Sequence, residues 1–496
     1  MKKRNWIKAI LISALLTFSV GTAVYANPYE PGTAGDASTF KKGEVKYSEI
    51  VFVSGEAILL TGKATIAEDA KGKLTFTATL ANTDKKATLN RKFVFTVTED
   101  TNATGGQVRK VVELSPGFTE SIVVGSDTYT LSEYYFSGSS VVDQRAVINY
   151  RALSWNGRKE YTKAALAEAL VVDVNAENNS YSSDWSSTEV SLMDMQFTWN
   201  SKDATTGAIT KKVGNAKVAV SETKTKLVEY AENAASSISF GGKYILKETT
   251  ENTISWKTDM PGTGTGAAEI RKKEKGSSKI TKMPTQKMYF VPNLKDIGKD
   301  YWARDAIFKM AAMDVISTKE SYYFRPLLGI SKAEFAKALV TVGNLKLTGT
   351  GSVSRLPYGV KFTDVPDTHP FSKYIFAAVN TEMMAGETTK LFKPDKSLSR
   401  SYAVKTIVSA FGFEANSTES EISTPFEDDD QIPEDEKKAM NIGYRMGIIS
   451  PDEYNRIDPT ERVSRAEAAD MLYKLIKYLE YDIKKDYKDK VVNFVL

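Results

Sequence analysis

Hydrophobic and polar residues alternate with a period of two through most of the segment from about residue 45 to 260. In residues 74–80 and 193–199 every second residue is hydrophobic, and residues 93–97 follow the same pattern apart from Val94. This alternation predicts strands with one buried and one solvated face, which is typical of antiparallel sheets. Glycine-containing turn signals such as Thr104-Gly105-Gly106 separate the segments. We therefore predict an all-β N-terminal part with an antiparallel, sandwich-like fold.

This β part carries a weak internal repeat. With an offset of 102 residues, six of the 17 positions in 95–111 are identical to those in 197–213, where chance would give about one. We interpret the match as two related β domains, over residues 40–160 and 161–260. A short connecting helix is predicted around residues 161–174. The alternative, that hairpins of simple composition resemble one another, stays open.

Residues 261–289 are rich in Gly, Ser and Lys and have no hydrophobic periodicity. This composition predicts an exposed linker between the β part and the rest of the chain. A polar hairpin is the competing interpretation.

After about residue 290 the hydrophobic period becomes helical, and a threefold repeat is present over residues 290–350, 358–416 and 422–482. Its first landmark is an aromatic or aliphatic residue, a polar residue and a proline: Phe324-Arg325-Pro326, Phe392-Lys393-Pro394 and Ile457-Asp458-Pro459. Five positions after each proline stands a serine followed by a basic residue: Ser331-Lys332, Ser399-Arg400 and Ser464-Arg465. An aspartate precedes the first landmark by 28 residues in two copies and by 29 in the third: Asp296, Asp364 and Asp428.

The serine of each copy begins a helix. Ser331 with Glu334 and Ser464 with Glu467 match the capping box, whereas Ser399 is followed by Tyr402 and keeps only the serine half. The basic residues Lys332, Arg400 and Arg465 would then occupy the first helical position, where the helix dipole disfavours a cation. Their recurrence indicates either an anion site at the helix N-terminus or an ion pair with a neighbouring aspartate. We favour the anion site.

The order and spacing of these landmarks resemble the S-layer homology domain, which occurs as three tandem copies on bacterial surface proteins. The resemblance covers about residues 290–480 and rests on Tyr301-Trp302-Ala303 as well as on the repeated landmarks. It implies three copies packed as a pseudo-threefold helical bundle. It also implies non-covalent attachment to a secondary cell-wall polysaccharide that commonly bears pyruvate ketals. By this resemblance the polymer-binding residues are Lys332, Arg400, Arg465, Asp296, Asp364 and Trp302.

The three copies depart from the family pattern in different ways. The position of Trp302 is occupied by Pro370 in the second copy and by Asp435 in the third, so neither offers an aromatic face. The third copy opens with an acidic run, residues 427–430, that would repel an anionic polymer. We therefore expect unequal grooves, with the first copy the most competent and the third the least.

Composition narrows the chemistry further. The 496 residues contain 0 Cys and 1 His, so a disulfide scaffold, a thiol nucleophile and a cysteine metal site are excluded. The one histidine, His369, lies in a proline-flanked loop, and the net charge of +4 gives no reason to expect nucleic-acid binding. A carboxylate pair for glycoside hydrolysis, from Glu99-Asp100 or Glu133, stays open. We expect no catalytic residues, no metal and no cofactor.

Residues 1–26 have the layout of a secretory signal peptide. A basic start, residues 2–4, precedes an apolar stretch and the small residues of a cleavage site at Val24-Tyr25-Ala26. The apolar stretch is shorter than the roughly 20 residues that span a bilayer. We therefore expect a secreted chain without a transmembrane segment after cleavage.

These features predict a non-catalytic surface or S-layer-type structural protein, held on the bacterial wall by its helical copies. Self-assembly into a surface lattice is a candidate interaction. The alternative is an adhesin or carbohydrate-binding protein whose β domains recognise an external ligand, with Tyr134, Tyr135, Trp155 and Trp256 as candidate contact residues. A wall-anchored glycoside hydrolase ranks third.

Overall fold

The computed structural model describes residues 30–34, 44–69, 73–100, 107–163, 168–202, 205–232, 242–262, 270–282, 284–345, 347, 362–412 and 423–484. The predicted signal peptide lies outside the described residues. Among the described residues, none of the helices combines the length and the apolar character needed to cross a membrane.

The N-terminal part is one antiparallel sheet of 15 strands in which most neighbours in sequence are also neighbours in space. Its strands are β1 Gly32–Ala34, β2 Glu44–Val51, β3 Ile58–Glu68, β4 Lys73–Asn82, β5 Ala87–Asp100, β6 Gln107–Leu114, β7 Thr119–Val124, β8 Asp127–Gln144, β9 Ile148–Lys163, β10 Glu168–Ser183, β11 Ser186–Lys202, β12 Ile209–Ala231, β13 Lys243–Met260, β14 Lys272–Thr281 and β15 Thr285–Phe290. β15 pairs with β13 beyond β14, and β7 bridges β5 and β8. The antiparallel sheet predicted from the period-two pattern is confirmed.

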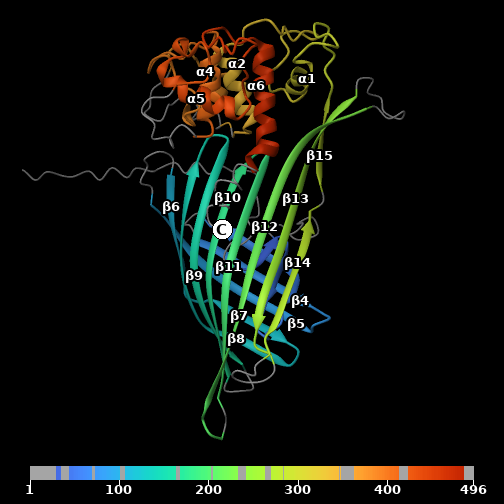
Figure 1. The fold of residues 1–496 in the computed structure, drawn as a ribbon, viewed down its shortest axis with the longest axis vertical. Helices are drawn as coiled ribbons and strands as arrows, with labels where there is room; N and C mark the ends of the chain where they lie inside the picture. The colour runs from blue at the N-terminus through green and yellow to red at the C-terminus, as the bar shows by residue number, and fades with distance from the viewer. Residues whose placement is uncertain are drawn as a thin grey trace, which may run out of the picture.

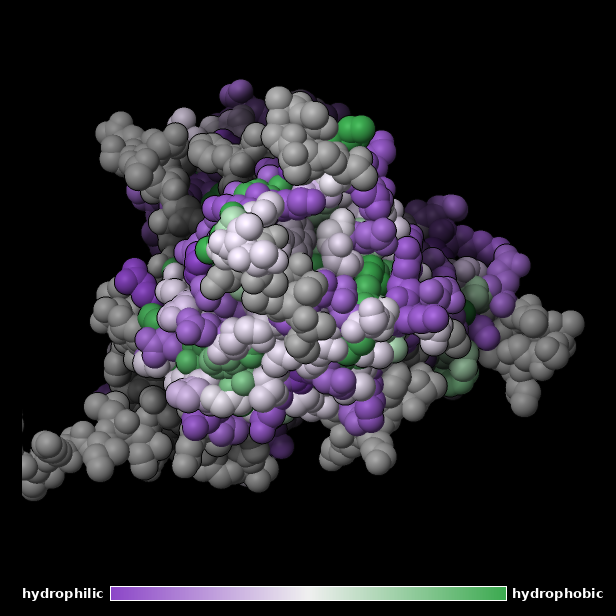
Figure 2. Space-filling view, turned by 90° about the horizontal axis from the view of Figure 1, so that it is seen from below, coloured by the Kyte–Doolittle hydropathy of each residue, from purple (hydrophilic) through white to green (hydrophobic). Residues whose placement is uncertain are grey.

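The sheet folds back on itself, so that its first strands cross behind the long strands β8–β14 (Figure 1). The hydrophobic core lies between these two layers because the buried side of each strand faces inward. Contacts between distant segments join the layers. The Trp199 indole N–H donates to the Val53 carbonyl at 2.9 Å, the Phe52 and Phe197 rings meet edge to face, and the Asn252 amide donates to the Ala34 carbonyl. Away from the helices, hydrophilic and neutral residues cover most of the described surface, with small hydrophobic areas between them (Figure 2).

Three predictions about the β part differ from the structure. The boundary between the two predicted domains falls inside β9, which pairs with β10 along its whole length, and both halves share one core. The predicted helix around residues 161–174 is strand wherever it is described, since Leu170, Val172 and Val174 are buried on alternate positions. The predicted linker contains β14 and β15, which both pair with β13 rather than with each other.

The C-terminal part is helical, and each copy contributes two helices. They are α1 Arg304–Ala312 and α2 Lys332–Val342 in the first copy, α3 Ser372–Asn380 and α4 Arg400–Ser409 in the second, and α5 Glu434–Arg445 and α6 Arg465–Lys477 in the third. The short turns η3 Asp429–Gln431 and η4 Tyr478–Asp482 belong to the third copy. Single β-bridges join Ser331 to Ser397, Ser399 to Arg462, and Ser464 back to Gly329, so the copies close into a ring. The predicted helical triple repeat is confirmed.

The helical ring rests on one end of the sheet (Figure 1) and shares its core with that end. Residues 146–148 of the β8–β9 turn, Tyr181, Trp185 and Tyr244 belong to the same hydrophobic cluster as the helices. The Trp185 indole donates to the Val342 carbonyl at 2.9 Å, the Val147 amide donates to the Ala410 carbonyl at 3.2 Å, and the Ser186 hydroxyl donates to the Leu479 carbonyl. The sheet therefore satisfies carbonyls at the C-terminal ends of the second helices of all three copies.

Candidate anion-binding grooves

The predicted aspartates hold the turn that precedes the second helix of each copy. Asp296 accepts hydrogen bonds from the Phe324 and Arg325 amides at 3.0 and 2.6 Å, and Asp364 accepts the equivalent pair from Phe392 and Lys393 at the same distances. Asp428 does the same in the third copy. The middle residue of each turn, Arg325, Lys393 or Asp458, has a positive φ of 59°, 59° or 46°. This left-handed conformation costs a non-glycine residue roughly 1 kcal/mol, which the paired amide contacts offset.

The helix caps match the sequence prediction. Both halves of the capping box are present at Ser331 with Glu334 and at Ser464 with Glu467, and Ser399 accepts from the Tyr402 amide alone. The N-terminus of each second helix is therefore fixed, and so is the position of its basic residue.

The amides of these N-termini are already used by a neighbouring copy. The Lys332 amide donates to the Lys396 carbonyl of the second copy at 2.8 Å, and the Arg400 amide donates to Glu461 of the third copy at 2.9 Å. The Arg465 amide closes the ring on Leu328 of the first copy at 2.9 Å. The following amide in each helix also donates to the neighbour, to Pro394, Pro459 or Pro326. The prediction that free amides at this position receive an external anion is therefore wrong, because protein carbonyls occupy them.

Two of the three basic side chains are likewise saturated by protein groups. Arg465 is fully buried, and its guanidinium donates to the Phe324 carbonyl at 2.8 Å, the Ser317 carbonyl at 2.6 Å and the Glu334 carboxylate at 2.9 Å. Burial lowers the pKa of Arg465, although the Glu334 carboxylate opposes this effect. Arg400 donates to the Ile457 carbonyl and the Glu467 carboxylate, both at 2.6 Å. The ion-pair alternative therefore describes both arginines, with the capping-box glutamate of the next copy as the partner.

Lys332 lacks this partner because the next copy has Tyr402 at the position of the glutamate. Its ammonium lies 4.6 Å from the centre of the Phe392 ring and 5.4 Å from that of Tyr402. The nearest carboxylate is Glu387 at 4.0 Å, and the described residues offer this ammonium no hydrogen-bond acceptor. Burial lowers the pKa of Lys332 to about 8, with Glu387 acting in the opposite direction.

The surroundings of Lys332 are cationic. Lys393 and Lys396 both lower its pKa, so their positive charges lie within reach of it, and both side chains are exposed. Glu387 pairs with Lys396 at 2.7 Å. At the corresponding place beside Arg400, the groups are the carboxylates of Asp458 and Glu467. The interface between the first and second copies therefore has a surplus of positive charge that the Arg400 interface lacks.

The structure places Trp302 at a different interface from Lys332. Trp302 is 62% exposed and stands just before α1, which packs against α6 of the third copy. Trp302 therefore adjoins a helix of the interface that contains Arg465, whereas Lys332 faces the second copy. The predicted polymer-binding residues thus divide among separate interfaces rather than forming one groove.

The glutamate partners of the arginines could have been predicted from the sequence. The two copies whose basic residue is arginine are followed, around the ring, by a copy with a capping-box glutamate. The copy with Lys332 is followed by the copy with Tyr402. The two positions therefore change together: arginine in one copy goes with glutamate in the next, and lysine goes with tyrosine. Such paired changes indicate a contact between copies.

Comparison with known proteins agrees with this repeat. The family model of the S-layer homology domain matches residues 293–336, 361–401 and 425–469. Three copies of the S-layer homology domain form the C-terminal part of this chain. The domain is an anchoring module of bacterial cell surfaces that binds cell-wall polysaccharide in general.

Relatives with matching segments include enzymes and a surface-layer protein. The chain is 26% identical over 180 residues to an exoglucanase XynX of Acetivibrio thermocellus and 24% identical over 180 residues to an amylopullulanase of Thermoanaerobacterium thermosulfurigenes. It is 27% identical over 197 residues to a surface-layer 125 kDa protein of Lysinibacillus sphaericus. These matches cover 36%, 36% and 39% of this chain but only 16%, 9% and 16% of the relatives. The chain thus spans less than a fifth of the length of each of these relatives.

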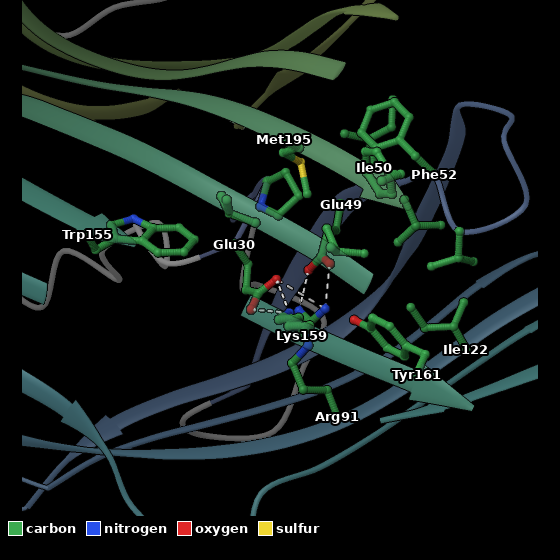
Figure 3. Close-up of a pocket in the computed structure, with 16 residues that line it drawn as sticks. Glu30, Glu49, Ile50, Phe52, Arg91, Ile122, Trp155, Lys159, Tyr161 and Met195 are labelled. Atoms are coloured by element: carbon green, nitrogen blue, oxygen red, sulfur yellow. Dashed lines mark hydrogen bonds and ion pairs between the residues drawn. The ribbon is translucent and has the colours of Figure 1, made fainter. Parts of the chain in front are cut away.

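The sheet holds a cluster of buried charges that includes three carboxylates and two cations (Figure 3). The carboxylates Glu30, Glu49 and Glu120 surround Arg91 and Lys159, with Arg91 2.6 Å from Glu49 and Lys159 2.8 Å from Glu30. Burial raises the pKa of Glu30 to about 7, against the effect of both cations. For Glu120 the cations outweigh burial, and its pKa is lowered.

One cavity beside this cluster has a volume of about 40 Å³, which admits a few water molecules but not a sugar ring. A second hollow of about 370 Å³ is lined by Arg91 and Glu120 together with Asn90, Phe118 and Thr130. The carboxylates that the sequence offered as a hydrolase pair do not form one. Glu99 pairs with Lys110 at 2.5 Å, and Glu133 accepts from the Tyr135 hydroxyl at 2.8 Å, both on the exposed surface. His369 accepts the Phe371 amide at Nδ1 within its own turn. Among the described residues, no group of acidic or histidine side chains is arranged to hold a metal ion.

Proposed function

We propose that the three S-layer homology copies bind an anionic secondary cell-wall polysaccharide through the interface that contains Lys332. The observation that carries this proposal is the cationic surplus of Lys332, Lys393 and Lys396 over the two carboxylates that act on Lys332, Glu387 and Asp364. A carboxylate of the polymer, as in a pyruvate ketal, would supply the negative charge that Tyr402 does not provide. Because Lys332 is already desolvated, an anion that reaches it gains more than it would at an exposed lysine.

In this proposal Arg400 and Arg465 support the ring instead of contacting the polymer. Their guanidinium groups bind carbonyls and carboxylates of the next copy, so each links two copies. Asp296 and Asp364 support the turns in the same way. Trp302, exposed at the Arg465 interface, remains available to stack on a sugar face, so we retain it as a secondary contact.

We further propose that the sheet is a non-catalytic body displayed at the cell surface. Its buried carboxylates Glu30, Glu49 and Glu120 are all held by Arg91 or Lys159, which favours this assignment over a glycoside hydrolase. Among the aromatic residues considered for the adhesin alternative, Tyr134 and Trp155 are in the core and Trp256 is partly buried against it. Tyr135 alone among these four is well exposed, so a stacking platform for an external glycan has little support.

The test is cosedimentation of the full-length chain with purified cell walls, because the helices share their core with the sheet and a helical fragment would lose part of it. Walls stripped of the secondary polysaccharide, or of its pyruvate, should no longer retain the protein. Lys332→Gln should weaken retention about tenfold or more, whereas Lys390→Gln, an exposed lysine in the second copy, should not. Full retention on stripped walls, or equal behaviour of the two variants, would refute the proposed groove.

A further inference from the structure

The outer face of the sheet carries a row of lysines that the fold does not require. Lys217 on β12 stands directly opposite Lys257 on β13, which stands directly opposite Lys275 on β14. Side chains opposite one another on adjacent antiparallel strands lie about 5 Å apart, and like charges there are unfavourable. Three lysines in one row therefore repel one another across roughly 10 Å of sheet.

The row points away from the core. Val218, in the row next to it, is buried, and Gly276 of that same row lies so close to the Trp256 ring that a Cβ would come within 2.3 Å. Lys217, Lys257 and Lys275 occupy the alternate positions and are exposed. They form an accessible surface on the strands β12–β14, which run along the side of the molecule (green to yellow in Figure 1).

Carboxylates neutralise this face only in part. Lys217 pairs with Asp194 at 3.1 Å, and the next outward row pairs Lys273 with Asp259 at 3.9 Å. Further along the sheet, Lys279 pairs with Glu251 at 2.6 Å. Asp259 is also held by Arg271 at 2.7 Å. For Lys257 and Lys275 the described residues provide no ion pair. Positive charge thus remains at the centre of the row.

The residues beside the lysines are suited to hydroxyl-rich ligands. The next row in one direction contains Ser255 opposite Ser277, and the next row in the other contains Asn215. Short hydroxyl and amide side chains on a flat surface can exchange hydrogen bonds with a polysaccharide without a deep pocket. Lysine, as a point charge on a flexible stem, tolerates varied positions of the anion along a polymer.

We propose that this lysine row is a second binding face, on the sheet, for a linear polysaccharide that bears carboxylates. A second copy of this chain fits the face less well, because acidic residues on this side of the sheet are engaged: Asp194, in the same row, with Lys217 and Asp173 with Arg158. The face is separate from the Lys332 groove and does not depend on it.

The position of the lysine row determines how the sheet would lie relative to a bound polymer. On β13, Tyr244 packs into the core shared with the helices, and Lys257 lies 13 residues further along the strand, about 40 Å away. Since one continuous strand connects the two positions, a polymer bound at the helical copies raises the local concentration of polymer beside the row. The sheet would then lie along the polymer instead of projecting from it.

The experiment measures binding of the full-length chain to polygalacturonate, with neutral dextran as the control ligand. Substituting Gln for Lys217, Lys257 and Lys275 together should lower the affinity about tenfold or more and weaken its salt dependence. The matched variant changes Lys63, Lys85 and Lys110 to Gln, which removes the same charge from lysines already paired with Glu44, Glu56 and Glu99. It should bind polygalacturonate nearly as well as the unchanged chain.

Further measurements make the result decisive. Both triple variants should keep the thermal unfolding temperature of the parent, since the ion pairs that they break, including that of Lys217 with Asp194, lie on the surface and contribute little. Repeating the binding in a Lys332→Gln background separates the two faces: loss through Lys332 alone would overturn the second face and leave the proposed groove standing. Equal affinity of the two triple variants would also overturn the row, as would a change in sedimentation-derived oligomeric state caused by the row substitutions alone.

Discussion

Arg465 and Lys332 occupy the same position in their helices, but the neighbouring copy surrounds the two side chains with different groups. Each basic residue follows an N-capping serine, donates its amide to the next copy and points its side chain at that copy. At Arg465 the next copy supplies Glu334 and two carbonyls, so each of the three guanidinium nitrogens donates to a protein group. At Lys332 the next copy supplies two aromatic rings and a distant carboxylate.

The difference shows that a repeated motif does not imply a repeated site. The deciding residue stands at the third helical position of the neighbouring copy. A glutamate there pairs with the cation, whereas a tyrosine leaves the positive charge without a carboxylate partner. Divergence of one copy can therefore create a binding site while the other copies preserve the ring.

The strongest prediction concerns Arg465, whose loss should destabilise the whole ring. Arg465→Ala leaves the Phe324 and Ser317 carbonyls without this donor in a buried setting and removes one of the two cations that pair with Glu334, the other being Lys319. Breaking such a pair costs about 3–5 kcal/mol. The free energy of unfolding, measured by denaturant titration of the full-length chain, should fall by that amount. The control variant Lys474→Ala breaks a surface pair with Asp470 and should change the free energy of unfolding by less than about 1 kcal/mol. Similar losses in the two variants would show that the Arg465 interface is not structural.

The second prediction converts the Lys332 interface into one of the other type. Tyr402→Glu would give Lys332 the capping-box carboxylate that Arg400 and Arg465 already have. The internal ion pair should displace the polymer, so wall binding should weaken about tenfold while the fold is kept. Tyr402→Phe serves as the control, because it keeps the ring and adds no charge. Undiminished wall binding by Tyr402→Glu would show that the polymer does not use Lys332.

How well each part of the fold could be predicted depends on how far apart in the sequence its interacting residues lie. Alternation in residues 193–199 and the caps at Ser331 and Ser464 are local, and both were predicted correctly. The closure of the sheet depends on contacts such as Trp199 with Val53, 146 residues apart, which leave no periodic signal. The Gly- and Lys-rich segment was assigned to a linker because its hydrophobic pattern is weak, yet Gly276 is in β14 since only glycine fits against Trp256.

The candidate site was predictable in part for the same reason. Repetition alone identified Lys332, Arg400 and Arg465 as a set, and the resemblance to the S-layer homology domain added Asp296, Asp364 and Trp302. Which of them are occupied by protein groups depends on how the copies meet around the ring, and this required the contacts between Arg465 and Glu334 and between Arg400 and Glu467. Their role in polymer binding stays a prediction.

A third prediction uses pH to separate charge from structure at Lys332. Burial lowers its pKa from 10.5 to about 8, so the ammonium is lost as the pH rises through 8 in the folded chain but only near 10.5 in the unfolded chain. Between these values the unfolded state binds more protons, and the free energy of unfolding therefore rises with pH. Wall binding should fall severalfold over the start of the same interval, because a neutral amine cannot pair with a carboxylate.

The variant Lys332→Arg should abolish the alkaline loss of binding, since a guanidinium stays charged throughout this range. Wall retention of the two proteins, measured from pH 7 to pH 9.5, provides the comparison, and thermal unfolding at each pH provides the control for stability. A parallel decline in the arginine variant would assign the loss to the polymer or to another group.

The smallest effect is expected at Trp302, where the Arg465 interface has its one exposed aromatic residue of the type the resemblance implied. Because Trp302 is 62% exposed, Trp302→Ala should leave the unfolding free energy within about 0.5 kcal/mol of the parent. If a sugar stacks there, wall binding should weaken by about threefold to tenfold, the value of one aromatic contact. Trp302→Phe should restore most of that binding. An unchanged affinity in the alanine variant would restrict polymer contact to the Lys332 interface, and would make the contrast between the two interfaces complete.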